Sequence, residues 1–252
     1  MPTALVTGAT AGIGAAFARR LAADGFSLVL VARDRDRLAE QAALVARRYG
    51  VDAEVLPADL STDDGLKVVE ERLREGVDLL VNNAGFGNRA MFLSAPVEDE
   101  LTMMKVHCEA VLRLTYAALP HMRAKGRGGV INVASVAAFF TRGTYGASKA
   151  WVVNFSGAVA AETNADGVRV MALCPGFVHT EFHQRAGMDT TSIPKYLWLE
   201  ADPVVRTAMR DLALGKVVSV PDPRYKVIVG VGRLLPQNLT ARISTHIGRR
   251  FR

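Results

Sequence analysis

Short apolar runs alternate with segments of helical period along most of this chain, and that alternation limits the possible folds more than any other feature. The apolar runs lie at residues 3–8, 27–33, 53–60, 77–85, 129–135, 168–176 and 225–230. Residues 13–25, 35–50 and 65–76 repeat apolar side chains about every four positions, which is typical of amphipathic helices. Because strands that alternate with helices form parallel sheets covered on both faces, the sequence predicts a doubly wound α/β fold.

The chain has 252 residues, of which 50% are hydrophobic and 22% charged, and this length suits one large α/β domain. We expect this domain to span residues 1–230. Within it, residues 177–203 read as a long loop with short helices, and such loops are often lids over a substrate. Residues 231–252 form an irregular, basic C-terminal segment.

The two cysteines, Cys108 and Cys174, lie in apolar contexts without metal-ligand spacing, so we expect reduced core residues and no metal site. A strand begins by residue 4 and a glycine-rich loop by residue 8, which predicts no N-terminal signal. No apolar run reaches the roughly 18 residues of a membrane span. These features favour a cytoplasmic protein.

Positive charge is concentrated near the C-terminus. The net charge is +6, and residues 216–252 hold eight Lys or Arg and one Asp, which leaves −1 for residues 1–215. This basic, partly apolar tail could contact an anionic membrane surface at the inner face, or pack on its own domain or on a sister subunit, which we favour. The body has no mixed basic and aromatic patch, so no nucleic-acid partner is expected.

The first predicted strand runs into the glycine-rich turn TGATAGIG, which opens a helix. Glycine allows backbone N–H groups to approach a pyrophosphate, and a helix N-terminus favours its negative charge. The spacing is G-x-x-x-G-x-G, not the general G-x-G-x-x-G fingerprint. We expect cofactor contacts from Gly8, Thr10, Gly12, Ile13 and Gly14.

The end of the second predicted strand indicates which cofactor binds. An acidic residue there accepts the ribose 2′-OH of NAD, whereas an Arg accommodates the 2′-phosphate of NADP. Arg33 occupies this position and Asp34 follows it. We therefore favour NADP(H) over NAD(H), although the glycine loop itself holds no basic residue. Arg37 could assist, or could be a solvated helix residue.

Other candidate cofactor-binding residues follow later strands, at the sheet edge where open α/β sheets bind ligands. They are Asp59, Leu60, Asn83, Ala84, Gly85, Pro175, Gly176, Val178 and Thr180. Asp59 could accept a hydrogen bond from an adenine amino group or cap the next turn. Asn82 and Asn83 could tie together the backbones of neighbouring strands.

Tyr145 and Lys149 are four residues apart, with only small residues between them. On a helix they share one face. One interpretation is a surface Tyr resting on a Lys stem. The other is a catalytic pair, since a free phenol has a pKa of about 10 and a nearby cation lowers it towards the neutral range.

Taken in order, TGATAGIG, NNAG, Ser135, YGASK and PGFVHT resemble the short-chain dehydrogenase/reductase family over residues 3 to about 180. The resemblance, which includes 3-oxoacyl and ketone reductases, implies that Tyr145 is the general acid/base. It also implies that Lys149 lowers the Tyr145 pKa and binds the nicotinamide ribose, and that Ser135 orients the substrate carbonyl. It further implies a homodimer or homotetramer built on the helices that carry His107 and Tyr145.

Two features depart from the family pattern. His107 lies 28 residues before Ser135, where the family has an Asn whose backbone carbonyl holds a proton-relay water. The His107 carbonyl could keep that relay and its ring could titrate in the useful range, or the residue could merely be tolerated at a helix kink. The 10-residue spacing from Ser135 to Tyr145 is shorter than in many members, which shortens one wall of the pocket.

Aromatic and apolar residues flank the expected substrate pocket, namely Phe86, Met91, Phe139, Phe140, Phe177, Phe182 and Trp198, although several could be core residues. Such a lining suits a hydrophobic carbonyl compound, for example a long-chain 3-oxoacyl chain, a sterol or a lipid ketone. We therefore expect an NADPH-dependent carbonyl reductase. The alternatives are an NAD-linked alcohol dehydrogenase and a non-catalytic protein that senses NADP.

Overall fold

The computed structural model describes residues 1–87, 92–140, 143–187, 191 and 193–234. At its centre is a seven-stranded sheet in the order β3-β2-β1-β4-β5-β6-β7, and every neighbouring pair is parallel. The strands are β1 (Thr3–Thr7), β2 (Ser27–Ala32), β3 (Ala53–Pro57), β4 (Leu79–Asn82), β5 (Gly128–Val133), β6 (Val168–Leu173) and β7 (Val218–Ser219). The strand order reverses between β1 and β4, which confirms the predicted doubly wound, Rossmann-type sheet.

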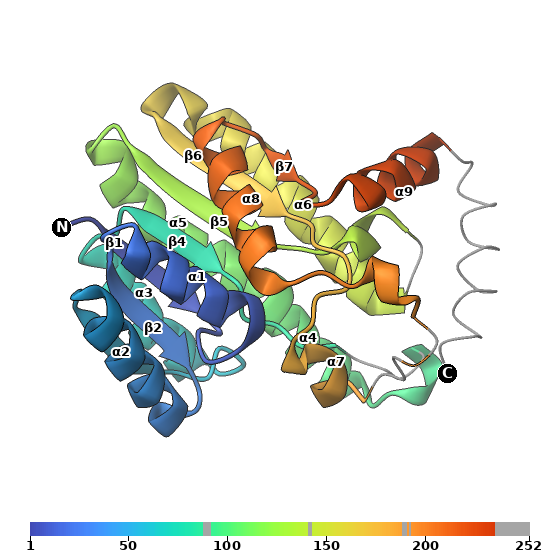
Figure 1. The fold of residues 1–252 in the computed structure, drawn as a ribbon, viewed down its shortest axis with the longest axis horizontal. Coiled ribbons are helices and arrows are strands. Elements are labelled where there is room, and N and C mark those ends of the chain that lie inside the picture. Colours follow the sequence, from blue (N-terminus) through green and yellow to red (C-terminus); the bar gives the residue numbers. More distant parts are fainter. Residues whose placement is uncertain (88–91, 141–142, 188–190, 192, 235–252) are drawn as a thin grey trace.

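Helices cover both faces of this sheet (Figure 1). One face packs against α1 (Gly12–Ala23), α2 (Arg35–Tyr49) and α8 (Ala201–Ala213). The other face packs against α3 (Asp63–Arg74), α5 (Ala110–Ala124) and α6 (Gly143–Thr163). Strands β1, β2, β4, β5 and β6 are therefore buried on both sides, which explains why they read as continuous apolar runs, whereas the edge strand β3 is only partly buried.

Local capping sets where several helices begin and end. The Asp34 side chain accepts a hydrogen bond from the Arg37 N–H at the start of α2, and Thr62 does the same for Gly65 in α3. Gly50 ends α2 with a φ of 69°, a left-handed conformation that glycine adopts without strain. These signals explain why the helices expected at 35–50 and 65–76 lie within a few residues of their observed bounds.

The strand expected at 225–230 was wrong. These residues belong to helix α9 (Pro223–Leu234), and the last strand is the short β7. The start of α9 has a readable signal, because Asp222 accepts a hydrogen bond from the Arg224 N–H and Pro223 occupies the first helical position. Tyr225 and Val229, four residues apart, are both buried, so helical packing overrides the β-propensity of the intervening residues.

The segment between β6 and α8 is irregular. It contains the short helix α7 (Glu181–Arg185) and a 3₁₀ turn at Lys195–Leu197, and an isolated bridge joins Val178 to Leu199. The Tyr225 hydroxyl holds this segment, because it accepts from the Phe177 N–H (3.0 Å) and donates to the Leu197 carbonyl (2.7 Å). Helix α9 therefore anchors the expected lid.

The domain boundary expected at residue 230 lies inside α9. The basic tail that follows lies mostly outside the described residues, so its expected packing or membrane contact remains a prediction. Among the helices in the described part of the chain, none is both long enough and apolar enough to cross a membrane. Cys108 and Cys174 are free thiols in the interior, as expected.

Candidate active site

The loops that follow β1, β4, β5 and β6 lie along the carboxyl edge of the sheet. Ser135 follows β5, and Lys149 and Tyr145 lie on the first two turns of α6. Helix α6 packs against both β6 and the 3₁₀ turn that begins after Ser135. The structure thus gathers at this edge the three residues expected to carry the chemistry.

Lys149 is buried, and its Nζ donates a hydrogen bond to the Val133 carbonyl at the end of β5 (3.0 Å). The same Nζ lies 5.8 Å from the centre of the Tyr145 ring. Burial lowers the pKa of Lys149 to about 8, so the side chain is mostly protonated at neutral pH. The surface interpretation of this Tyr–Lys pair is therefore wrong.

Tyr145 lies between two aromatic partners. Its ring makes an edge-on contact with the His107 ring at 5.6 Å and a tilted contact with the Phe182 ring at 6.0 Å. Aromatic pairs at these separations and angles are attractive, so they restrict where the phenol can point. Phe182 belongs to α7, which places the expected lid directly beside Tyr145.

Ser135 is the N-cap of the 3₁₀ turn Val136–Phe139. Its Oγ accepts a hydrogen bond from the Ala137 N–H (3.1 Å), and the next residue, Val136, donates its N–H to the Pro175 carbonyl (3.0 Å). The Ser135 turn is therefore fixed to the loop after β6. Its side chain is only partly buried, so it is accessible from the carboxyl edge.

His107 lies in a π-helical turn, Lys105–Glu109, between α4 (Val97–Met104) and α5. Its Nε2 accepts a hydrogen bond from the Phe86 N–H (3.2 Å), and its Nδ1 is 3.0 Å from Ser148 Oγ. Burial, with a contribution from the Lys149 charge, holds the His107 pKa well below its usual value. Burial and the Lys149 charge therefore oppose the expectation that this ring titrates in the useful range, because both disfavour its charged form.

The loop after β4 is fixed to β1 by several hydrogen bonds. Thr7 Oγ1 accepts from the backbone N–H groups of Asn83 and Ala84, both at 2.9 Å. The Asn83 side chain donates to the carbonyls of Thr7 (2.9 Å) and Gly8 (3.2 Å), as expected of a residue that ties neighbouring strands together. This leaves Gly85 exposed at the edge of the site.

Asn82 acts through side chains, whereas a link to neighbouring backbones was expected. Its Nδ2 donates to Thr115 Oγ1 (3.1 Å) and to Asn132 Oδ1 (2.9 Å). Asn132 in turn donates to Ser156 Oγ on α6 (3.0 Å). This buried polar chain joins α5, β4, β5 and α6 beneath the site, and sequence reasoning missed it because its members are far apart along the chain.

The glycine loop has the geometry of an anion-binding turn. Gly8 and Gly12 have positive φ values of 65° and 54°. A Cβ on Gly12 would lie 2.7 Å from Thr180 Cγ2, so the loop packs closely against the expected lid. Helix α1 begins with neither a side-chain cap nor an acidic residue in its first turn, which leaves its N–H groups for an anion. These residues fit a dinucleotide pyrophosphate.

Two of the charged residues after β2 have partners within the protein. Asp34 caps α2, whereas Arg33 is exposed at the end of β2. Arg37 donates to both carboxylate oxygens of Glu181 on α7 (2.7 and 3.2 Å) and to the Thr10 carbonyl (3.3 Å). Arg37 is therefore neither simply solvated nor free, but bridges α2, the glycine loop and the lid.

Asp59 caps its own turn, which was one of the two expected roles. Its Oδ1 accepts from the Ser61 N–H (2.9 Å) and the Ser61 hydroxyl (2.7 Å). Burial opposes ionisation, but the Ser61 hydrogen bonds and the Arg33 charge outweigh it and lower the Asp59 pKa. The carboxylate is thus ionised at neutral pH.

The aromatic residues expected to line the pocket contact different parts of the structure. Phe86 contacts His107 (5.6 Å), whereas Phe177 and Phe182 contact His183 (5.7 and 5.4 Å). Trp198 stacks on His179 at 4.5 Å. Phe139 packs against a core cluster and Phe140 lies against Gly232 of α9, so these two line the base of the region. Met91 lies outside the described residues.

His183 was not singled out from the sequence. It is buried among the rings of Phe177, Phe182 and Trp198, and its Nδ1 has no hydrogen-bond partner in the described part of the chain. The burial of His183 could not be predicted from its neighbours in sequence, because the aromatic cluster forms only when the fold brings Trp198 against α7.

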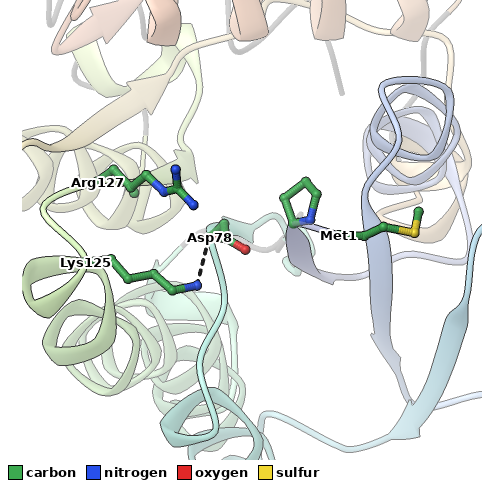
Figure 2. A pocket seen from close by; sticks show the side chains of 6 residues that line it. Met1, Asp78, Lys125 and Arg127 are labelled. Carbon is green, nitrogen blue, oxygen red and sulfur yellow. Dashed lines mark hydrogen bonds and ion pairs between the residues drawn. The ribbon is translucent and has the colours of Figure 1, made fainter.

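A cavity of about 590 Å³ lies at the opposite, amino-terminal edge of the sheet (Figure 2). Its lining residues are Met1, Pro2, Asp78, Lys125, Arg127 and Gly128. Asp78 is bound there by Lys125 (3.1 Å) and by the Thr3 N–H (2.8 Å). None of the residues expected to act on substrate or cofactor lines this cavity.

Comparison with known proteins identifies the family. The family model described as short chain dehydrogenase matches residues 2–190. The chain belongs to the short-chain dehydrogenase/reductase family. Members of this family are oxidoreductases that use NAD(H) or NADP(H) and act on small molecules, so the expectation of an oxidoreductase is confirmed.

Three similar proteins illustrate the relationship. The short-chain reductase protein NovJ of Streptomyces niveus is 34% identical over 91% of this chain and 86% of its own. The 3-oxoacyl-[acyl-carrier-protein] reductase FabG of Aquifex aeolicus is 32% identical over 70% of this chain and 74% of its own. The structure of a short-chain dehydrogenase from Sphingobium yanoikuyae in complex with NADPH is 35% identical, covers 92% of this chain and 93% of its own, and superposes with a TM-score of 0.85.

Proposed function

We propose that this short-chain dehydrogenase reduces the carbonyl group of a hydrophobic ketone with NADPH, with Tyr145 as the general acid. The observation that carries the proposal is the buried Lys149, which lies 5.8 Å from the Tyr145 ring. Burying a cation is costly and is rarely tolerated without a function. A protonated Lys149 stabilises the phenolate that remains once Tyr145 has given up its proton.

Within this proposal, Tyr145, Ser135 and Lys149 have separate roles in the reduction of the carbonyl group. The glycine loop and the start of α1 would hold a reduced nicotinamide cofactor, which would supply the hydride for the carbonyl carbon. Tyr145 donates a proton to the carbonyl oxygen, and the Ser135 hydroxyl donates a hydrogen bond to the same oxygen. Lys149 stays protonated below pH 8 and balances the negative charge that develops on Tyr145.

For the cofactor, the glycine loop and the start of α1 would hold the pyrophosphate, and Arg33 would bind the 2′-phosphate. The NADPH complex of the relative from Sphingobium yanoikuyae supports this choice. Arg33→Ala should weaken NADPH binding about tenfold or more and leave NADH binding nearly unchanged, since a phosphate contact is lost only for NADPH. Fluorescence titration of both nucleotides measures this, and equal weakening of both would contradict the assignment.

For the substrate, the rings of Phe86, Phe177 and Phe182 offer an apolar surface near Tyr145. The similarity to a 3-oxoacyl-[acyl-carrier-protein] reductase supports a 3-oxoacyl compound as one such substrate. Each added methylene that is buried contributes about 0.8 kcal/mol, so turnover efficiency should rise about threefold to fourfold per CH₂ until the pocket is full.

The first experiment follows NADPH oxidation over 3-oxoacyl thioesters of increasing chain length, with Tyr145→Phe as the paired variant. Tyr145→Phe should bind NADPH normally and lose turnover by about 10²-fold or more, because only the proton donor is removed. Equal loss of binding and turnover would make Tyr145 structural. Normal NADPH binding by the wild type without turnover of any ketone would favour a non-catalytic sensor.

A further inference from the structure

The hydrogen bonds around His107 fix which of its nitrogens carries a proton. The Phe86 backbone N–H can only donate, so Nε2 accepts and is unprotonated. A neutral imidazole then carries its proton on Nδ1, which donates to Ser148 Oγ at 3.0 Å. The Ser148 hydroxyl donates onward to the Tyr145 carbonyl at 2.8 Å. These three bonds run in one direction, from the loop after β4 to the first turns of α6.

We propose that His107 is a positioning residue that stays neutral throughout the reaction and fixes the Tyr145–Lys149 face of α6 relative to the loop after β4. This inference rests on the proposed function, because it assigns the ring a task within that site. It differs from a catalytic role, in which the ring itself would gain and lose a proton.

The surroundings of the ring favour the neutral form on every side. Lys149 on α6 places a positive charge near the ring. Both side chains lie close to Gly85, since a Cβ placed there would lie 3.0 Å from His107 Nε2 and 3.5 Å from Lys149 Nζ. Tyr145 presents its ring edge-on, and the burial-raised pKa of Cys108, on the same turn, keeps that thiol neutral. No carboxylate pairs with the ring among the contacts of the described residues. A second positive charge here would be buried and would face Lys149 without compensation, and burial first and the Lys149 charge second lower the His107 pKa.

The position of the ring explains why its loss would affect the reaction. Phe86 follows Gly85 at the edge of the site, and Ser148 lies between Tyr145 and Lys149 on α6. A rigid link between the two keeps the phenol at a fixed distance from the loop after β4. Displacements of about 1 Å in such a site can lower turnover about 10²-fold.

Two substitutions each keep half of this link. The amide of Asn reaches about as far as Nδ1, so His107→Asn keeps a donor for Ser148 and loses the acceptor for Phe86. The longer Gln reaches about as far as Nε2, so His107→Gln keeps the acceptor and loses the donor. We expect each to lower kcat about tenfold and His107→Ala about 10²-fold, with KM and NADPH affinity changed by less than about threefold. Equal kcat in all three variants, or a loss of NADPH affinity that matches the loss of kcat, would overturn the proposal.

A spectroscopic measurement tests neutrality without relying on turnover. Nitrogen-15 NMR of the histidine rings, with His107 assigned from the signals missing in His107→Asn, should show the Nδ1-protonated tautomer. The signals should not move between pH 8 and pH 5.5. A tautomer protonated on Nε2, or a titration near pH 6.5, would overturn the proposal even in a fully active enzyme.

His121→Gln is the matched control, because His121 lies at the opposite end of α5 and its ring packs against Gly76, away from the site. It should leave kcat and the His107 signals unchanged. If wild-type protein binds NADPH but reduces no ketone, the proposed function is wrong. The NMR prediction is still tested in that case, because it does not depend on turnover. In Ser148→Ala the Nδ1 proton loses its acceptor while the Phe86 N–H still holds Nε2, so the tautomer should stay the same and the Nδ1 signal should shift. A change of tautomer, or an unchanged NMR spectrum, in that variant would overturn the link.

Discussion

At the scale of single residues, burial of the Lys149 charge lowers the stability of the folded protein. Lys149 is buried with a pKa lowered to about 8, whereas an unfolded Lys has a pKa near 10.5. Between these values the unfolded chain binds more protons than the folded one, so the Lys149 contribution to stability rises with pH from about 8 to 10.5. Below pH 8 the destabilising effect is constant and, at about 1.4 kcal/mol per pKa unit, amounts to about 3 kcal/mol.

Lys149→Met should therefore be more stable than the wild type at pH 7, by about 2 kcal/mol once the lost hydrogen bond to Val133 is counted, yet inactive. The difference should shrink as the pH rises from 8 towards 10.5. Urea unfolding of the cofactor-free proteins across this range measures it. Lys67→Met, at an exposed position on α3, is the control and should show no such trend. A Lys149→Met protein that is less stable at pH 7 would refute the interpretation.

At the scale of elements, a clasp joins the glycine loop to the expected lid. We use this name for the contacts of Arg37 with Glu181 and with the Thr10 carbonyl, which join α2, α7 and the glycine loop. Both side chains are about two-fifths exposed, with fractions of 36% and 43%, so the ion pair is worth only about 0.5–1 kcal/mol. A contact of this strength suits a segment that must open in each catalytic cycle.

Glu181→Gln should speed NADPH release about twofold to fivefold, because one of the contacts that hold the lid is weakened. Stopped-flow displacement of NADPH measures the dissociation rate, and added salt should speed release from the wild type more than from the variant.

Asp202→Asn is the matched control, since Asp202 pairs with Arg19 at the same distance of 2.7 Å but joins α1 to α8. It should leave the NADPH dissociation rate unchanged. Slower release from Glu181→Gln, or equal effects of the two substitutions, would show that the clasp does not control the lid.

At the scale of the whole molecule, several large apolar side chains are exposed along one segment of the chain. The outer side of the segment formed by α4, the π-helical turn and α5 exposes Leu101 by 63%, Leu112 by 44% and Tyr116 by 78%. Contiguous exposed apolar side chains mark interfaces. The assembly expected from the family would bury this side of α5 against a second copy.

Tyr116→Asp should shift the protein towards monomer, because a charge at the centre of an apolar interface must be desolvated. Sedimentation velocity at several protein concentrations measures the change. Tyr196→Asp, which alters an equally exposed tyrosine (65%) outside this surface, should not change the assembly. A wild-type protein that is monomeric at every concentration would rule out the interface.

The sequence by itself determined strands β1 to β6, several of the helices and the positions of Ser135, Tyr145 and Lys149 at the carboxyl edge of the sheet. The apolar runs of the strands, the Asp34 and Thr62 caps and the glycine turn each depend on residues that are close together in the chain. Such local patterns can be recognised from the sequence alone. The pair Tyr145–Lys149 was also readable, because four residues make one helical turn. The prediction of a strand at 225–230 was wrong, because it gave more weight to the β-branched residues there than to the helix-start signal of Asp222 and Pro223.

Only the tertiary structure decided what surrounds those residues. The direction of the His107 hydrogen bonds, the buried Asn82–Asn132 chain and the Arg37 clasp join residues that are 21 to 144 positions apart. Burial likewise cannot be read from spacing, yet burial makes Lys149 a titrating group and His107 a neutral one. The identity of the reactive groups is a local property of the chain, whereas their protonation depends on the solvent that the whole fold excludes.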